Sequence, residues 1–163
     1  MKIGFIGLGN LGTAICSRLS SLGDELIVYN RNKDKIKDLP YKIVNTPKDI
    51  LKECDVIFLC LFDLPAVENI LSGENGILCE QLKGKTIIDL TTNHYEDVLK
   101  FHKMVNDIGA NYLENPVFGS VAPALSGALT VVSSGKTEVF ENVKPILEKI
   151  AVEIFHLEVP SSA

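Results

Sequence analysis

The chain has 163 residues, which suits one domain of ordinary size covering residues 1–163. Hydrophobic residues make up 46% and charged residues 23%, so a globular core is expected and disorder is not. The formal net charge of −5 argues against nucleic acid as the main partner, and no apolar run approaches the roughly 20 residues that would span a bilayer.

Short apolar strands alternate along the chain with amphipathic helices. Strands are expected over residues 2–7, 25–30, 42–44, 55–61, 85–90, 111–114, 129–133 and 152–155. Helices are expected over residues 10–22, 33–39, 65–71, 95–108 and 137–149, with one more opening at Thr46-Pro47. This alternation predicts an α/β fold with a doubly wound, mainly parallel sheet of the Rossmann type. Ligands of such sheets bind at the carboxyl ends of the strands.

The cysteines and histidines form no recognisable site. The four cysteines have no Cys-x-x-Cys spacing, so we expect reduced thiols in a cytoplasmic protein. The three histidines are scattered and no matching carboxylate or cysteine set accompanies them. We therefore expect no metal site.

A glycine-rich turn follows the first expected strand. The pattern G-x-G-x-x-G is matched by Gly7, Leu8, Gly9, Asn10, Leu11 and Gly12. Gly7 allows a tight turn, Gly9 lets a pyrophosphate approach the backbone, and Gly12 lets the helix pack against the strand. The helix N-terminus supplies free N–H groups and a positive dipole end. A strand before the pattern and a helix after it favour dinucleotide binding over glycines used only in packing.

The second expected strand ends in "NRNK" rather than in an acid. An acid there would bind both ribose hydroxyls of NAD and repel a 2′-phosphate. Asn30 carries no charge, and the Arg31 guanidinium suits phosphate oxygens and can stack on adenine. We expect NADP(H) to be preferred over NAD(H), with cofactor contacts from Asn30, Arg31, Asn32 and Lys35. Lys33 and Lys37 are interpreted as a solvated face, offset by Asp34 and Asp38.

Two further stretches, with the glycine turn, resemble one family. "DLTTN" (89–93) and "NPVFGSVAPALSGALTVVSSG" (115–135) join "GFIGLGNLG" (4–12) in resembling the β-hydroxyacid dehydrogenases. This family includes 3-hydroxyisobutyrate dehydrogenase and 6-phosphogluconate dehydrogenase. The resemblance runs in order over essentially the whole chain. It implies the N-terminal NAD(P)-binding domain of an oxidoreductase acting on small β-hydroxy acids or the matching aldehydes and keto acids.

The resemblance assigns roles to particular residues. The loop passing the adenosine ribose and nicotinamide is implied to include Leu61, Phe62, Asp63 and Pro65. Thr92 matches a threonine at the nicotinamide end. Gly119 and Ser120 match small residues whose N–H groups hold the substrate carboxylate. Phe118 stands where a substrate-binding serine is usual, and the hydroxyl is therefore missing.

The catalytic lysine and the all-helical second domain of the family have no counterpart in these residues. We therefore expect the chain to be the N-terminal part of a longer protein, with no catalytic residue of its own and no activity alone. The full-length form is expected to be a homo-oligomer that binds a small carboxylate substrate. Two alternatives stay open: a non-catalytic dinucleotide-binding module, and an enzyme resembling pyrroline-5-carboxylate reductase.

Overall fold

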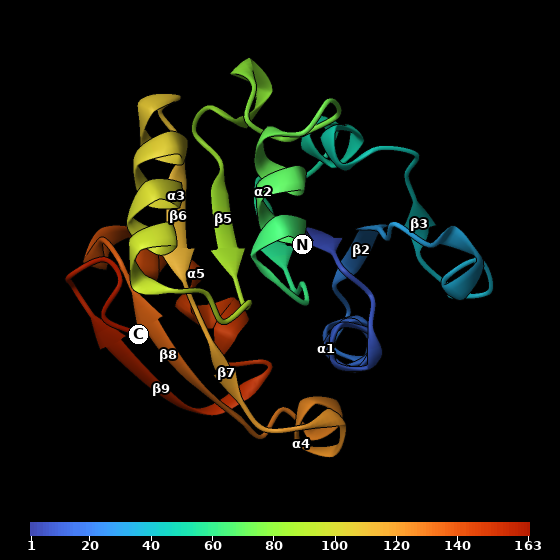
Figure 1. Ribbon diagram of the computed structural model, residues 1–163. Coiled ribbons are helices and arrows are strands. Elements are labelled where there is room, and N and C mark those ends of the chain that lie inside the picture. Colours follow the sequence, from blue (N-terminus) through green and yellow to red (C-terminus); the bar gives the residue numbers. More distant parts are fainter.

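The computed structural model describes every residue from Met1 to Ala163. Its strands form one sheet and are β1 (Lys2–Ile6), β2 (Glu25–Tyr29), β3 (Lys42–Ile43), β4 (Val56–Leu59), β5 (Thr86–Asp89), β6 (Asn111–Glu114), β7 (Val117–Phe118), β8 (Leu129–Ser134) and β9 (Ala151–Leu157). The strand order is β3-β2-β1-β4-β5-β6-β8-β7, with β9 beside β8 (Figure 1). The strands from β3 to β6 along this order are all parallel.

The helices cover both faces of this sheet (Figure 1). The α-helices are α1 (Asn10–Ser21), α2 (Leu64–Ser72), α3 (Tyr95–Asp107), α4 (Val121–Ser126) and α5 (Thr137–Leu147). One core cluster joins the sheet to α1, α4 and α5, and a second joins its other face to α2 and α3. The doubly wound α/β fold predicted from the sequence is thereby confirmed. No helix is long and apolar enough to cross a membrane.

The chain reverses direction near its end. β8 runs antiparallel to both β6 and β7, and β9 runs parallel to β8. The reversal passes through β7 and α4, two elements that the sequence analysis did not predict. Both are short, and Gly127 ends α4 in the left-handed conformation with φ of 74°. Two and six residues give too little periodicity to be recognised in the sequence.

Several expected elements are shorter or tighter than predicted. The helix expected over 33–39 is a single 3₁₀ turn, η1 (Lys33–Lys35), opened by the Asn32 side chain, which accepts from the Asp34 N–H. The helix expected after Thr46 is also 3₁₀, η2 (Pro47–Lys52), and Thr46 is its N-cap. The carboxylate of Asp49 accepts from both the N–H and the hydroxyl of Thr46. A third such turn, η3 (Glu80–Leu82), was not predicted.

Candidate cofactor site

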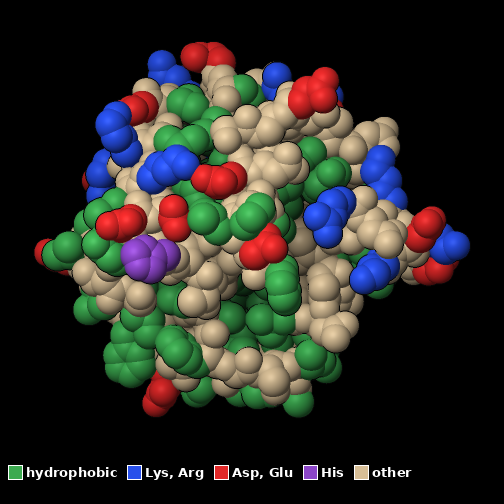
Figure 2. Space-filling model, viewed as in Figure 1, with side chains coloured by type: hydrophobic (Ala, Val, Ile, Leu, Met, Phe, Trp, Pro, Cys, Tyr) green, Lys and Arg blue, Asp and Glu red, His purple; other side chains and the backbone are tan.

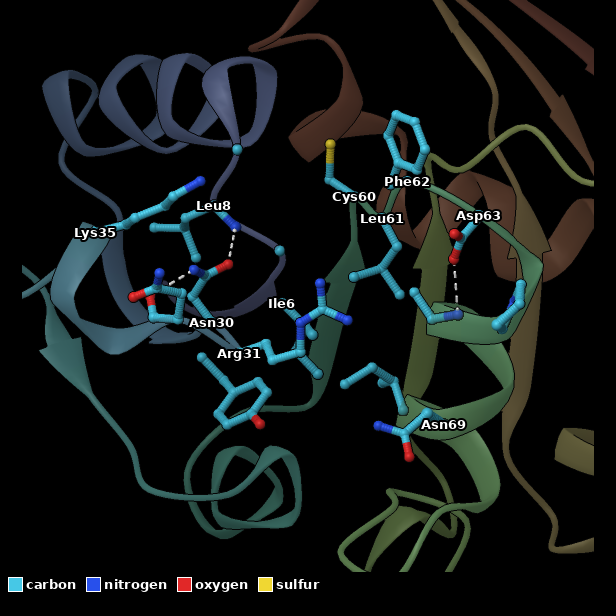
Figure 3. A pocket seen from close by; sticks show the side chains of 17 residues that line it. Ile6, Leu8, Asn30, Arg31, Lys35, Cys60, Leu61, Phe62, Asp63 and Asn69 are labelled. Carbon is cyan, nitrogen blue, oxygen red and sulfur yellow. Dashed lines mark hydrogen bonds between the residues drawn. The ribbon is translucent and has the colours of Figure 1, made fainter.

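A pocket of about 490 Å³ opens at the carboxyl edge of the sheet. Its walls are the turn between β1 and α1, the end of β2 with the residues after it, and the loop from β4 into α2 (Figure 3). Among the residues assigned to the cofactor from the sequence, those lining it are Gly7, Leu8, Gly9, Asn30, Arg31, Asn32, Lys35, Leu61, Phe62, Asp63 and Pro65. The fold therefore brings three separate sequence segments to one place.

The three motif glycines have different surroundings. Gly7 has φ of +100°, and a Cβ there would lie 2.2 Å from the Cys60 carbonyl oxygen. A Cβ on Gly12 would lie 2.1 Å from the Gly7 carbonyl oxygen, because the helix packs directly on the turn. A Cβ on Gly9 would meet no atom within 4 Å. Gly7 and Gly12 are thus required by the fold, whereas Gly9 keeps open space above the backbone.

The first turn of α1 offers unpaired donors to that open space. Gly9 is the N-cap of α1 and no side chain caps the helix. The backbone N–H groups of Gly9, Asn10 and Leu11 donate to no protein group. Free N–H groups at the positive end of a helix favour an anion. The residues of the turn therefore fit a pyrophosphate, and the open space beside Gly9 accommodates one.

Asn30 is a structural clamp for this turn. Its Oδ1 accepts from the Leu8 N–H at 3.1 Å, and its Nδ2 donates to the Asn32 carbonyl at 2.7 Å (Figure 3). One amide thus ties the glycine turn to the segment after β2. The sequence analysis gave Asn30 a cofactor contact and an uncharged side chain, and it missed this structural role.

Two cations near the pocket are free of protein partners. Arg31 and Lys35 take part in no hydrogen bond or ion pair, and Figure 3 shows Arg31 reaching into the pocket while Lys35 extends toward Leu8. Lys33, by contrast, donates to the Asn45 side chain at 2.9 Å. Figure 2 shows Lys and Arg side chains gathered beside the hollow, over the β2–β3 end of the molecule. No ion pair joins the cluster to Asp34 or Asp38, so the expected offset is not a direct contact.

The helix α2 supplies wall residues that the sequence analysis missed. The missed lining residues are Ile6, Tyr29, Cys60, Ala66, Asn69 and Ile70. Asn69 lies four positions after Pro65 on α2, so helical periodicity projected from Pro65 would have found it, whereas Ala66 and Ile70 do not follow from that spacing. Asp63 caps this helix by accepting from the Ala66 N–H at 3.0 Å.

Cys60 lies in the pocket but is not a nucleophile. Its burial, and to a lesser degree the nearby Asp89 charge, raise the pKa of the thiol to about 12. The thiol therefore stays protonated at neutral pH and behaves as a small apolar group. All four cysteines are free. No group of three or more His, Cys, Asp or Glu side chains is placed to hold a metal ion.

The remaining assigned residues lie outside this pocket. Asn10 borders a shallow hollow beside it, together with Lys35 and Thr13. Thr92 is exposed after β5, whereas its neighbour Thr91 is buried and its hydroxyl accepts from the Leu61 N–H at 3.0 Å. Leu11 and Gly12 belong to the first turn of α1.

The residues assigned to the substrate follow β6. Phe118 belongs to β7 and is 60% exposed, so its ring does not fill the core. Gly119 has φ of +139°, and a Cβ there would lie 2.6 Å from Leu129. Ser120 is the N-cap of α4, which packs beside α1. These three residues line neither described pocket.

The glycine turn, the unpaired helix N-terminus and the crevice at the carboxyl edge together define a dinucleotide-binding domain of the Rossmann type. The chain belongs to the β-hydroxyacid dehydrogenase family: residues 2–157 match the NAD binding domain of 6-phosphogluconate dehydrogenase.

Known proteins of this family are similar over nearly the whole chain. It is 37% identical to 2-hydroxy-3-oxopropionate reductase of Escherichia coli over 94% of its length, covering 53% of that enzyme. It is 30% identical to glyoxylate/succinic semialdehyde reductase 2, chloroplastic, of Arabidopsis thaliana over 96% of its length, covering 45% of that enzyme. A solved structure of Psf3 in complex with NADP⁺ and 2-OPP superposes with a TM-score of 0.94 at 31% identity, over 99% of this chain and 58% of that one. The chain thus spans about half the length of the relatives it matches.

Proposed function

We propose that this domain binds NADP(H), in preference to NAD(H), for an oxidoreductase that acts on a small aldehyde or keto acid. The observation that carries the cofactor preference is the pair of unpartnered cations, Arg31 and Lys35, beside an uncharged Asn30. A 2′-phosphate would give both cations a partner that no protein group supplies. Psf3, a similar structure, is solved with NADP⁺, which supports NADP(H) as a ligand of this domain.

The binding mode follows from the walls of the pocket. The free N–H groups of Gly9, Asn10 and Leu11 would hold the pyrophosphate. The adenosine would lie between Arg31 and the α2 wall, where the exposed Asn69 amide points into the same space (Figure 3). Leu61, Phe62, Asp63 and Pro65 would line the path toward the nicotinamide, with Thr92 at its end.

The chemistry of the whole protein is inferred from its relatives. When bound, a nicotinamide cofactor supplies hydride transfer, and the protein positions it and excludes competing reactions. The named reductases support a small carbonyl acid as the substrate class. We place its carboxylate at the backbone of Gly119 and Ser120, with Phe118 giving a less polar wall than the usual serine.

Cys60 cannot be the proton donor for a carbonyl substrate. Cys60, the thiol in the pocket, holds its proton too tightly to serve, because burial raises its pKa to about 12. The proposal therefore places the general acid, a lysine in the family, outside these residues.

The test is a fluorescence titration of the chain with NADPH and with NADH. We expect NADPH to bind at least about tenfold tighter, since tenfold needs only about 1.4 kcal/mol. We also expect no turnover of glyoxylate, succinic semialdehyde or 3-hydroxyisobutyrate by this chain. Equal affinities would refute the cofactor preference, and robust turnover would show that the proton donor lies within residues 1–163.

A further inference from the structure

A fully buried carboxylate lies beside the cofactor pocket without lining it. Asp89, the last residue of β5, has no exposed surface, and it pairs in register with Leu59 of β4 and Glu114 of β6. A buried carboxylate needs several donors to offset its lost hydration. The donors that Asp89 uses show what it holds in place.

The first donor, Thr91, connects Asp89 to the loop that starts at Leu61. The Thr91 N–H donates to Asp89 Oδ1 at 2.9 Å, which fixes the turn after β5. The hydroxyl of the same Thr91 then accepts from the Leu61 N–H at 3.0 Å. Asp89 is therefore joined through one residue to the backbone of the loop that lines the pocket.

The other donors anchor the carboxylate to the neighbouring strand β6 and to the loop after β5. The Tyr112 hydroxyl donates to Asp89 Oδ2 at 2.6 Å, and Tyr112 is itself buried on β6. The Asn93 Nδ2 donates both to Asp89 Oδ2 at 3.1 Å and to the Thr91 carbonyl at 3.2 Å. The residues on both sides of Thr92 are thus fixed by the same network.

We infer that Asp89 is a positioning residue for the nicotinamide half of the cofactor site. It holds the loop that starts at Leu61 and the Thr91–Thr92 turn in their binding geometry, while touching no part of the cofactor itself. The inference rests on the proposed function, and goes beyond it by assigning a role to a residue outside the pocket. Such preorganised support makes a site precise because the neighbouring backbone need not reorganise on binding.

The first test measures NADP⁺ binding to Asp89→Asn by calorimetry. The amide has the size of the carboxylate but keeps only one acceptor oxygen, and its NH₂ group must face some of the donors that now bond to Asp89, so the network loses at least one of its hydrogen bonds. We expect NADP⁺ to bind about tenfold more weakly, the effect of roughly one lost hydrogen bond. The fragment 2′,5′-ADP, which would reach only the Arg31 end of the pocket, should change by no more than about twofold.

Glu114→Gln is the matched control. Glu114 is also buried at the end of a strand, and it accepts from the Ser134 hydroxyl at 2.7 Å, but none of its bonds leads to the cofactor loops. We expect this variant to keep the wild-type affinity for NADP⁺. An equal loss in Glu114→Gln would mean that any buried carboxylate matters only for stability, and would overturn the inference.

Thr91→Val provides a second route if Asp89→Asn does not fold. The change keeps the shape of the side chain and removes the hydroxyl whose oxygen accepts from the Leu61 N–H. We expect NADP⁺ to weaken by about threefold or more, with 2′,5′-ADP again nearly unchanged. Wild-type NADP⁺ affinity in Thr91→Val would overturn the inference even without data on Asp89→Asn.

A pH series supplies a readout that a purely structural role would not change. Burial raises the pKa of Asp89 to about 6, which hydrogen bonds only partly offset. Protonation weakens the carboxylate as an acceptor, so wild type should come to resemble Asp89→Asn at low pH. The NADP⁺ dissociation constant of Asp89→Asn divided by that of wild type should therefore fall toward one as pH is lowered from about 7.5 to about 5. The 2′-phosphate titrates in the same range but cancels in this ratio.

The titration of Asp89 can be distinguished from that of the titratable groups near it. Burial raises the pKa of Cys60 to about 12 and that of Tyr112 well above its ordinary value, and it lowers the pKa of His102 to about 4. Burial also raises the pKa of Glu114, and the pH series is therefore repeated in the Glu114→Gln background. A ratio that is constant with pH there would overturn the inference. Wild-type protein that binds neither NADP⁺ nor 2′,5′-ADP would instead refute the proposed function itself.

Discussion

Arg31 is the residue on which the cofactor preference depends. Its guanidinium lies in the pocket without a protein partner, so it is free to pair with a 2′-phosphate. We expect Arg31→Ala to weaken NADPH by at least about tenfold, since a hydrogen bond to a charged group contributes about 1.5–3 kcal/mol. NADH, which lacks that phosphate, should change little. Fluorescence titration of both cofactors checks this, with Lys33→Ala as the control because Lys33 is bound to Asn45. Equal weakening of both would mean that Arg31 only stacks on adenine.

Asn30 shows why a residue's chemistry cannot be assigned from its charge alone. The sequence suggests a cofactor contact whose side chain carries no charge to repel phosphate, whereas the structure gives the amide one acceptor bond to Leu8 and one donor bond to Asn32. An aspartate there would keep the first bond and lose the second, placing a carboxylate against a carbonyl oxygen. A change at position 30 therefore alters both the turn and the cofactor charge, and Arg31 is the cleaner site for testing the preference.

At the scale of elements, a histidine on α3 and a carboxylate at the end of β5 make stability depend on pH in opposite directions. Burial lowers the pKa of His102 from 6.5 to about 4, so its contribution to stability is present above about pH 6.5 and is lost as pH falls through about 4. Burial raises the pKa of Asp89 from 3.8 to about 6, so its contribution is present below about pH 3.8 and is lost as pH rises through about 6. Between about pH 4 and 6 the two trends oppose each other.

Replacing His102 should therefore remove the loss of stability that this residue causes at low pH. We expect the Tm of His102→Phe, relative to wild type, to rise as pH is lowered from about 7 to about 4.5. The aromatic ring keeps the edge contact with Tyr112, whose centroid lies 4.8 Å from that of His102. Thermal unfolding followed by circular dichroism at the two pH values measures the change. His94→Phe, at an exposed position, is the control. A constant difference for His102→Phe would contradict the expectation.

Elements with an extended apolar pattern in their sequence were predictable, whereas elements that depend on tertiary contacts were not. The strand at Val56–Leu59 and the helix at Asn10–Ser21 follow directly from their sequence patterns. The reversal through β7 and α4 depends on pairing with β8 and packing on α1, which no local pattern encodes. In the pocket, the residues within motifs were found, whereas Tyr29 and Ile70 lie in no motif and become neighbours only through the fold.

At the scale of the whole molecule, the two ends of the sheet differ. The β3 edge is only two residues long, which gives little opportunity for pairing with another chain. The β9 edge has seven residues, pairs only with β8, and exposes Val152 by 72% and Phe155 by 55%. A long edge strand with exposed apolar side chains is a template for pairing with a second chain.

We therefore expect the chain to self-associate through β9 in a concentration-dependent way. Phe155→Lys should shift the equilibrium toward monomer, because a charge on an edge strand opposes pairing. Sedimentation velocity over a range of concentrations measures the effect. Leu22→Lys is the control: Leu22 is similarly exposed, at 45%, but it follows α1 and does not belong to β9. A monomer at every concentration would refute the expectation. The same shift in both variants would mean that added charge, rather than the β9 edge, controls association.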